Sequence, residues 1–70
     1  MASETVLERR RMTYARRLLA DLRSRGIDVR RVDNEIHLEF TGETEGFLRS
    51  VQDELDEFQA ELLYVLKQER

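Results

Sequence analysis

His37 is the only histidine in the chain and the first candidate for acid–base or metal chemistry. The alternation of apolar and polar residues predicts a strand over residues 35–40, with His37 on its polar side between Glu35 and Glu39. Catalysis and metal binding both need further groups that converge on the imidazole. The two carboxylates and Arg30 on the facing strand indicate an ion-pair ladder instead. We therefore expect His37 to lie at a surface or an interface.

Four acids crowd residues 53–57 and are the next candidates, for a cation site. They alternate around a predicted helix, and no glycine turn is interleaved as in a calcium loop. The chain has no cysteine, and it shows neither a nucleophile motif nor a glycine-rich phosphate loop. The sequence therefore favours a solvated acidic face and predicts no enzyme activity, no metal and no cofactor.

The arginines of Arg9-Arg10-Arg11 and Arg16-Arg17 could follow the phosphates of a nucleic acid. Against this, the net charge is −3, and Tyr14 is the only aromatic residue near them. The five arginines also spread around the predicted helix. The sequence favours ion pairing with acidic residues of the second half or with a protein partner, and nucleic-acid binding is the alternative.

Length and charge limit the class of protein. Seventy residues predict a single domain, 1–70, in which residues 1–13 form an arginine-rich helical extension and residues 14–67 the core module. Residues 1–31 carry a net charge of +5 and residues 32–70 one of −8. Without disulfides, a chain of this size often gains stability by association, so we expect a homodimer. No apolar run could span a membrane and no signal peptide is apparent, which makes a cytoplasmic location the default expectation.

The best-defined stretch is a helix end followed by a hairpin. Apolar spacings of three and four predict a helix over about residues 4–25, and Gly26 stands where a left-handed residue would end it. The period then changes to two, and Asp33-Asn34 supplies a two-residue turn. This turn fixes the expected pairs Val32–Glu35, Arg31–Ile36, Arg30–His37, Val29–Leu38 and Ile27–Phe40.

After the hairpin, a polar connector leads to a second helical region. Thr44 is the expected N-cap, and residues 47–70 read as one long helix or as two with a break near residues 53–57. The fold class is α+β, in the order αββαα. The predicted core is Leu18, Leu22, Ile27, Val29, Ile36, Leu38, Phe40, Phe47, Val51, Leu55, Phe58, Leu62 and Leu66.

The order of helix, glycine, hairpin and helical tail resembles the TubC-type N-terminal docking domain of nonribosomal peptide synthetases and hybrid polyketide assembly lines. The residues that carry the resemblance are 18–27 (LLADLRSRGI) and 60–66 (AELLYVL), with Phe47, Val51 and Leu55 at the family's spaced apolar positions. The resemblance covers about residues 15–67. It implies an often dimeric domain that captures a short, often acidic C-terminal tail of an upstream subunit.

The resemblance also implies that the second strand, 35–40, is the docking edge, and that Arg30 and Arg31 recognise the charge of the bound tail. The residues independently indicate a hairpin edge as the binding site. A two-stranded sheet has open edges, which favour addition of a strand unless a helix or a dimer partner covers them. The predicted partner-binding residues are Arg30, Arg31, Val32, Glu35, Ile36, His37, Leu38 and Glu39. The predicted dimerisation residues are Leu7, Tyr14, Leu18, Phe58, Leu62 and Leu66.

The sequence thus predicts a non-catalytic protein–protein interaction module whose partner is a protein or peptide. Two other functions are open at this point. One is a small phage- or plasmid-encoded inhibitor that acts by protein binding and charge mimicry, indicated by the acidic second half. The other is a nucleic-acid binder that uses the N-terminal arginines.

Overall fold

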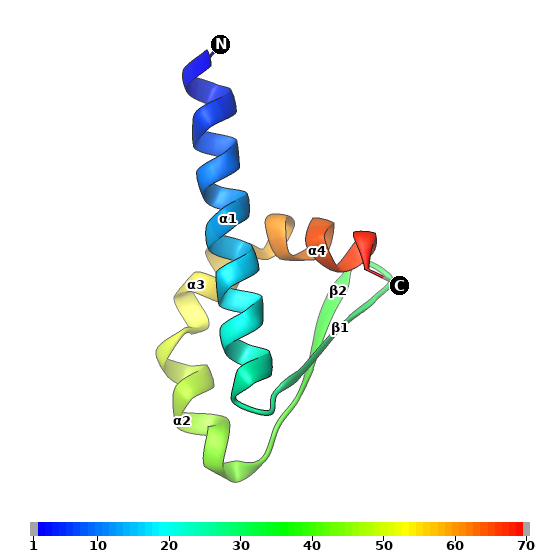
Figure 1. The fold of residues 1–70 in the computed structure, drawn as a ribbon. Helices are drawn as coiled ribbons and strands as arrows, with labels where there is room; N and C mark the ends of the chain where they lie inside the picture. Colours follow the sequence, from blue (N-terminus) through cyan, green and yellow to red (C-terminus); the bar gives the residue numbers. More distant parts are fainter. Residues whose placement is uncertain (1, 70) are drawn as a thin grey trace.

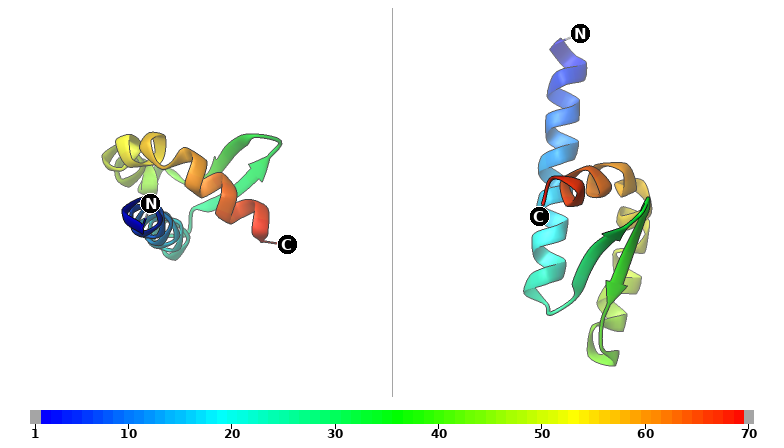
Figure 2. Two further views of the ribbon diagram at one scale, coloured as in Figure 1. Left: turned by 90° about the horizontal axis from the view of Figure 1, so that it is seen from above. Right: turned by 90° about the vertical axis from the view of Figure 1, so that its right-hand side faces the viewer.

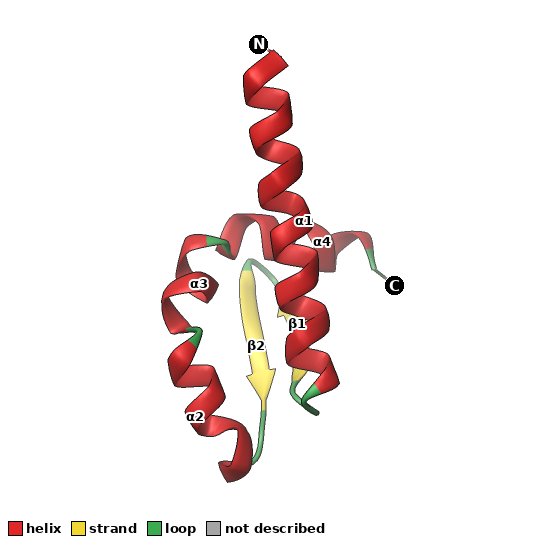
Figure 3. Ribbon diagram, turned by 60° about the vertical axis from the view of Figure 1, so that its left-hand side comes forward, coloured by secondary structure: helices red, strands yellow, loops and turns green. Residues whose placement is uncertain are grey.

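A computed structural model describes residues 2–69, and its side chains are described from residue 6. The elements are α1 (Ala2–Ser24), β1 (Asp28–Val32), β2 (Glu35–Glu39), α2 (Gly42–Ser50), α3 (Gln52–Glu57) and α4 (Gln59–Gln68). Figure 3 shows the hairpin between α1 on one side and α2 and α3 on the other, and Figure 1 shows α4 near the upper end of the hairpin. The predicted α+β class and the order of its first elements are confirmed.

α1 ends in a glycine-centred reversal. Gly26 has a φ of +84° and its N–H donates to the Arg23 carbonyl at 3.0 Å, while the Ile27 N–H donates to the Leu22 carbonyl at 3.1 Å. This pair of bonds is the Schellman motif, in which the residue after the glycine packs back on the helix. Leu22 and Ile27 are accordingly 0% and 2% exposed. The predicted helix stop is confirmed.

The hairpin has the predicted register from Val32–Glu35 to Val29–Leu38, and the ladder continues to Asp28–Glu39. Asp33 takes the positive φ of the turn, at 57°. The prediction was wrong for Phe40, because the ladder ends before it and its side chain is 47% exposed instead of lying in the core. There the chain leaves the strand for α2, so alternation no longer decides which way a side chain points.

The C-terminal half forms three short helices, whereas the sequence predicted one or two. The breaks lie at Val51 (φ −110°, ψ 11°) and Phe58 (φ −101°, ψ 18°), either side of the acidic stretch. Each break turns the chain, so that the buried residues Leu55 and Leu62 can both reach the core from successive helices. The predicted N-cap was also wrong: α2 begins at Gly42 after Thr41, and Thr44 donates its hydroxyl to the Thr41 carbonyl at 3.0 Å.

The core lies where α1, the hairpin and the three later helices meet. Most predicted members are buried, and Ile36, Leu38, Phe47 and Phe58 are half-buried against them. The buried residues are Ala15, Leu18, Leu19, Leu22, Ile27, Val29, Leu48, Val51, Leu55, Leu62, Val65 and Leu66. The core therefore joins the first helix to the last, and α1 and α4 are the helices that lie closest to the hairpin.

The helix stop can be tested with two matched glycine substitutions. A Cβ added at Gly26 or at Gly46 meets nothing within 4 Å, so neither substitution creates a clash. Gly26→Ala should lower the free energy of unfolding by about 1–2 kcal/mol, because an L-residue is strained at positive φ. Gly46→Ala, inside α2, should raise it by about 0.5–1 kcal/mol. Urea unfolding measures both, and effects of the same sign would contradict the assigned backbone at Gly26.

Candidate functional site

The polar face of the hairpin carries the ion-pair ladder that the sequence predicted. Arg30 Nε lies 2.7 Å from Asp28 Oδ2, and its Nη2 lies 3.9 Å from Glu39 Oε1. The hydrogen bond to Asp28, followed by the negative charges of Asp28 and Glu39, raises the pKa of Arg30. His37 Nε2 lies 3.7 Å from Glu35 Oε1. All these side chains are exposed, so the ladder is a surface feature.

Both arginines predicted to read charge are held by groups of their own hairpin. Arg30 is paired with Asp28 on the same strand, and Arg31 donates from Nη1 to the backbone carbonyl of Asp33 in the turn. The charges that run along β2 itself are Glu35 and Glu39, both exposed. The surface next to the β2 edge is therefore more acidic than a docking edge for acidic tails would be.

The two edges of the hairpin differ. Hydrogen-bonded and non-bonded pairs alternate along an antiparallel ladder, and the two-residue turn makes Val32–Glu35 and Arg30–His37 hydrogen-bonded pairs. On β1, the backbone N–H and C=O groups of Val29 and Arg31 therefore point away from β2. On β2 the outward groups belong to Ile36 and Leu38. Arg23 of α1 donates from Nη2 to the Val29 carbonyl at 3.1 Å, which engages the β1 edge.

The β2 edge has no such contact from the side chains of residues 6–69. In that part of the chain, no hydrogen bond reaches the outward N–H or C=O groups of Ile36 and Leu38. α4 is close to both strands, as expected for a helix that covers a face of the hairpin and not one edge. Of the predicted partner-binding residues, those on β2 thus line the open edge, whereas Arg30, Arg31 and Val32 belong to the engaged strand.

Arg23 was missed by sequence reasoning. It makes a bidentate pair with Glu69, at 2.7 Å from Nη1 to Oε2 and 2.8 Å from Nη2 to Oε1. The hydrogen bond between them is the main cause that raises the pKa of Arg23 and lowers the pKa of Glu69. Its partners, Val29 and Glu69, lie 6 and 46 residues away, and no local pattern indicates the second.

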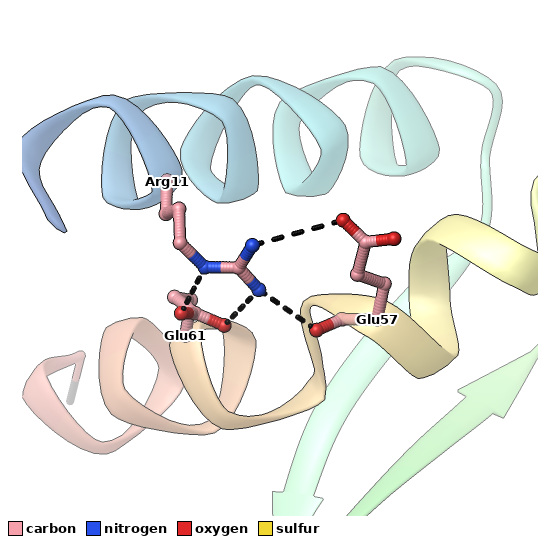
Figure 4. Close-up of polar contacts among 3 residues, drawn as sticks. All are labelled: Arg11, Glu57 and Glu61. Atoms are coloured by element: carbon pink, nitrogen blue, oxygen red, sulfur yellow. Dashed lines mark hydrogen bonds and ion pairs between the residues drawn. The ribbon is translucent and has the colours of Figure 1, made fainter. Parts of the chain in front are cut away.

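Arg11 holds α1 to the junction of α3 and α4 (Figure 4). Its Nε lies 2.8 Å from Glu61 Oε2, and its Nη2 donates to the Glu57 carbonyl at 3.0 Å. The guanidinium also stacks on the Phe58 ring at 4.4 Å from the centroid, and Tyr14 packs on the same ring at 4.6 Å. The hydrogen bond between Arg11 and Glu61 is the main cause that raises the pKa of Arg11 and lowers the pKa of Glu61. The expected pairing of these arginines with the acidic half is confirmed for Arg11.

The predicted dimerisation residues separate into two groups. Leu18, Leu62 and Leu66 lie in the core of the single chain, and Phe58 is half-buried beneath Arg11 and Tyr14. Leu7 and Tyr14 are 59% and 42% exposed. Leu7 and Tyr14 are thus the members with the most area free for a second chain, and the homodimer itself stays a prediction.

Among the side chains of residues 6–69, no group of three or more His, Asp or Glu residues is placed to hold a metal ion. Over the same residues, no helix has the length and apolar character needed to cross a membrane. No family model, curated protein or solved structure gave a match to this chain.

The Arg11 contact predicts a specific pH dependence of stability. The pKa of Glu61 lies below its ordinary value of 4.5 in the folded chain, so near that pH the unfolded chain binds more protons. The free energy of unfolding should therefore fall as the pH is lowered through the region from about pH 5 to pH 3. Glu61→Gln should make this decrease smaller, as measured by urea unfolding at each pH.

Glu43→Gln is the matched control, because Glu43 is an exposed acid on α2. This variant should show nearly the same decrease as the unchanged protein. A Glu61→Gln variant with an unchanged pH profile would show that the pair with Arg11 does not contribute to stability.

Proposed function

We propose that this chain is a non-catalytic protein-interaction module that binds a short peptide segment of a partner by strand addition to β2. The observation that carries the proposal is the difference between the edges. Arg23 engages the β1 edge, and the outward groups of Ile36 and Leu38 on β2 have no hydrogen-bond partner among residues 6–69. An added strand would lie about 4.8 Å from β2 and pair with these groups.

The side chains of β2 define what the added strand would carry. Ile36 and Leu38 are half-buried on the core side, while Glu35, His37 and Glu39 are exposed on the other. Because side chains alternate along a strand, a fitting peptide places apolar residues beside Ile36 and Leu38 and charged residues beside the two acids. The partner segment would therefore alternate apolar and charged residues.

The charge of that segment follows from the ion pairs. Arg30 and Arg31 are already held by Asp28 and by the Asp33 carbonyl. Glu35 and Glu39 stand next to the open edge, so a basic segment would meet opposite charges and an acidic one like charges. Cross-strand charge pairs contribute roughly 0.2–1 kcal/mol each, enough to select between peptides whose backbone bonds are equal.

The biological setting that we propose is assembly-line docking, in which the peptide is the C-terminal tail of an upstream subunit. The support is the arrangement that resembles the TubC-type docking domain: a helix stopped by Gly26, a hairpin and a helical tail. The basic segment proposed here differs from the often acidic tail that the resemblance implies.

Two synthetic peptides that differ only in charge test the proposal. Both alternate valine with a charged residue over about six positions, one with lysine and one with glutamate. Isothermal titration calorimetry should show that the lysine peptide binds and that the affinity of the glutamate peptide is lower by about tenfold or more, since two charge pairs change sign. Binding of neither peptide would overturn strand addition, and preference for the glutamate peptide would overturn the charge assignment.

A matched pair of substitutions locates the binding on β2. Leu38→Pro removes the outward N–H and should abolish binding, whereas Leu38→Ala shortens the same side chain, keeps the N–H and should retain most of it. Circular dichroism checks that both variants fold. Equal binding by the two variants would show that the β2 backbone does not contact the peptide.

A further inference from the structure

Four arginines of α1 form two rows on the face turned away from the core. Residues seven apart lie almost on one line along a helix, about 10.5 Å from each other. Arg9 and Arg16 make one row and Arg10 and Arg17 the other, and all four are exposed. Arg11, which belongs to the same sequence cluster, points to Glu61 on the opposite side (Figure 4). The structure thus separates five arginines that the sequence alone leaves spread around the helix.

The strip between the two rows carries small side chains. Thr13 and Ala20 lie there seven residues apart, preceded by Val6, which is 47% exposed. The extended arginines on both sides therefore reach further from the helix axis than the strip between them. The helix itself forms a narrow ridge on the molecule, which we call the ridge. Its crest is a shallow hollow lined by Val6, Arg9, Arg10, Thr13, Tyr14 and Arg17, with a row of positive charges along each flank.

Two acids of α1 have described side chains, in residues 6–24: Glu8 lies away from the ridge, and Asp21 lies beside Arg17 at its C-terminal end. Glu8 lines a hollow with Met12 and Glu61, on the side of α4. Asp21 Oδ1 lies 3.6 Å from Arg25 Nε, and Asp21 lines a hollow with Arg17 and Glu54 on the side of α2 and α3. Among the side chains of residues 6–69, no carboxylate makes an ion pair with any of the four ridge arginines.

The position of α1 leaves the ridge accessible. Seen from above, α1 stands at one side of the molecule, and its N-terminal half extends beyond the other elements (Figure 2). The body measures 44 × 25 × 18 Å, with α1 along the long dimension (Figure 1). A long, rod-shaped partner can thus lie along this helix without meeting the hairpin.

We propose that the ridge binds duplex DNA, with α1 in the major groove. That groove is about 12 Å wide and 8.5 Å deep and admits a helix, and phosphates line both of its walls. Two rows of arginines flanking a narrow ridge match two charged walls, whereas an acidic helix of a protein would match one row. The deep, narrow major groove of A-form RNA would not admit the helix.

Binding at this ridge does not depend on base sequence. The ridge residues Val6, Thr13 and Ala20 offer one hydroxyl and no amide or acid to read base edges. The arginine rows contact phosphates, which fix position and carry no sequence information. The excess of acids lies in residues 32–70. Glu69 lines a hollow with Arg16 and Glu54 lines one with Arg17, whereas the hollow at Arg9 and Arg10 contains no acid. At physiological salt, charges more than about 8 Å apart are largely screened, so the N-terminal end of the ridge has the strongest positive potential.

Fluorescence anisotropy with a labelled 20-base-pair DNA duplex at several salt concentrations tests the proposal. Four phosphate contacts predict a dissociation constant of about 10⁻⁴ to 10⁻⁶ M. The logarithm of the association constant should fall with the logarithm of the salt concentration, with a slope of roughly −3 to −4. The fourfold variant Arg9→Gln, Arg10→Gln, Arg16→Gln, Arg17→Gln should lose at least tenfold in affinity and most of the slope.

The control variant removes four charges elsewhere: Arg30→Gln, Arg31→Gln, Arg49→Gln and Lys67→Gln, all exposed. Its net charge equals that of the ridge variant, so similar losses in both would overturn the assignment to α1. Absence of binding by the unchanged protein, or equal binding of duplex RNA, would also overturn it. Binding of poly-glutamate in preference to DNA would assign the ridge to an acidic protein instead.

Discussion

The left-handed backbone of Gly26 is the constraint on which the rest of the fold depends. It lets Ile27 turn back on Leu22, and these two side chains are among the most deeply buried in the chain. The hairpin leaves α1 at a fixed angle because both bonds of the Schellman motif are made. The face that carries Ile27 and Val29 is thereby aimed at the later helices, and Leu62 of α4 closes over it.

The arginines of α1 divide into two groups with different physical roles. Arg11 and Arg23 hold α1 to α4 through carboxylates and backbone carbonyls, and Arg23 also engages one edge of the hairpin. The same side chain therefore stabilises the helix pair and determines which strand edge is left for a partner. The second group carries its positive charge into solvent on the far side of the helix, so the two proposed interaction surfaces do not compete for residues.

The sequence was a good guide where the determinants of structure are local. The stop at Gly26, the turn at Asp33-Asn34 and the register of the ladder all follow from residues within a few positions of each other. Phe40 was misplaced because alternation holds only as far as the ladder does. The breaks at Val51 and Phe58 fall at apolar residues beside the crowded acids, since packing on the core decides where the helices bend.

The contacts between α1 and α4 impose an order on folding. Arg11 reaches Glu61 and Arg23 reaches Glu69 across 50 and 46 residues, so these contacts form only after the intervening chain has been synthesised. The Schellman turn and the hairpin are complete in sequence by residue 40, yet Leu18 and Leu22 of α1 still lack Leu62. Local structure is then marginal until the distant helix arrives. A fragment that ends before α4 would leave an apolar helix face uncovered, and the chain should fold as one cooperative unit.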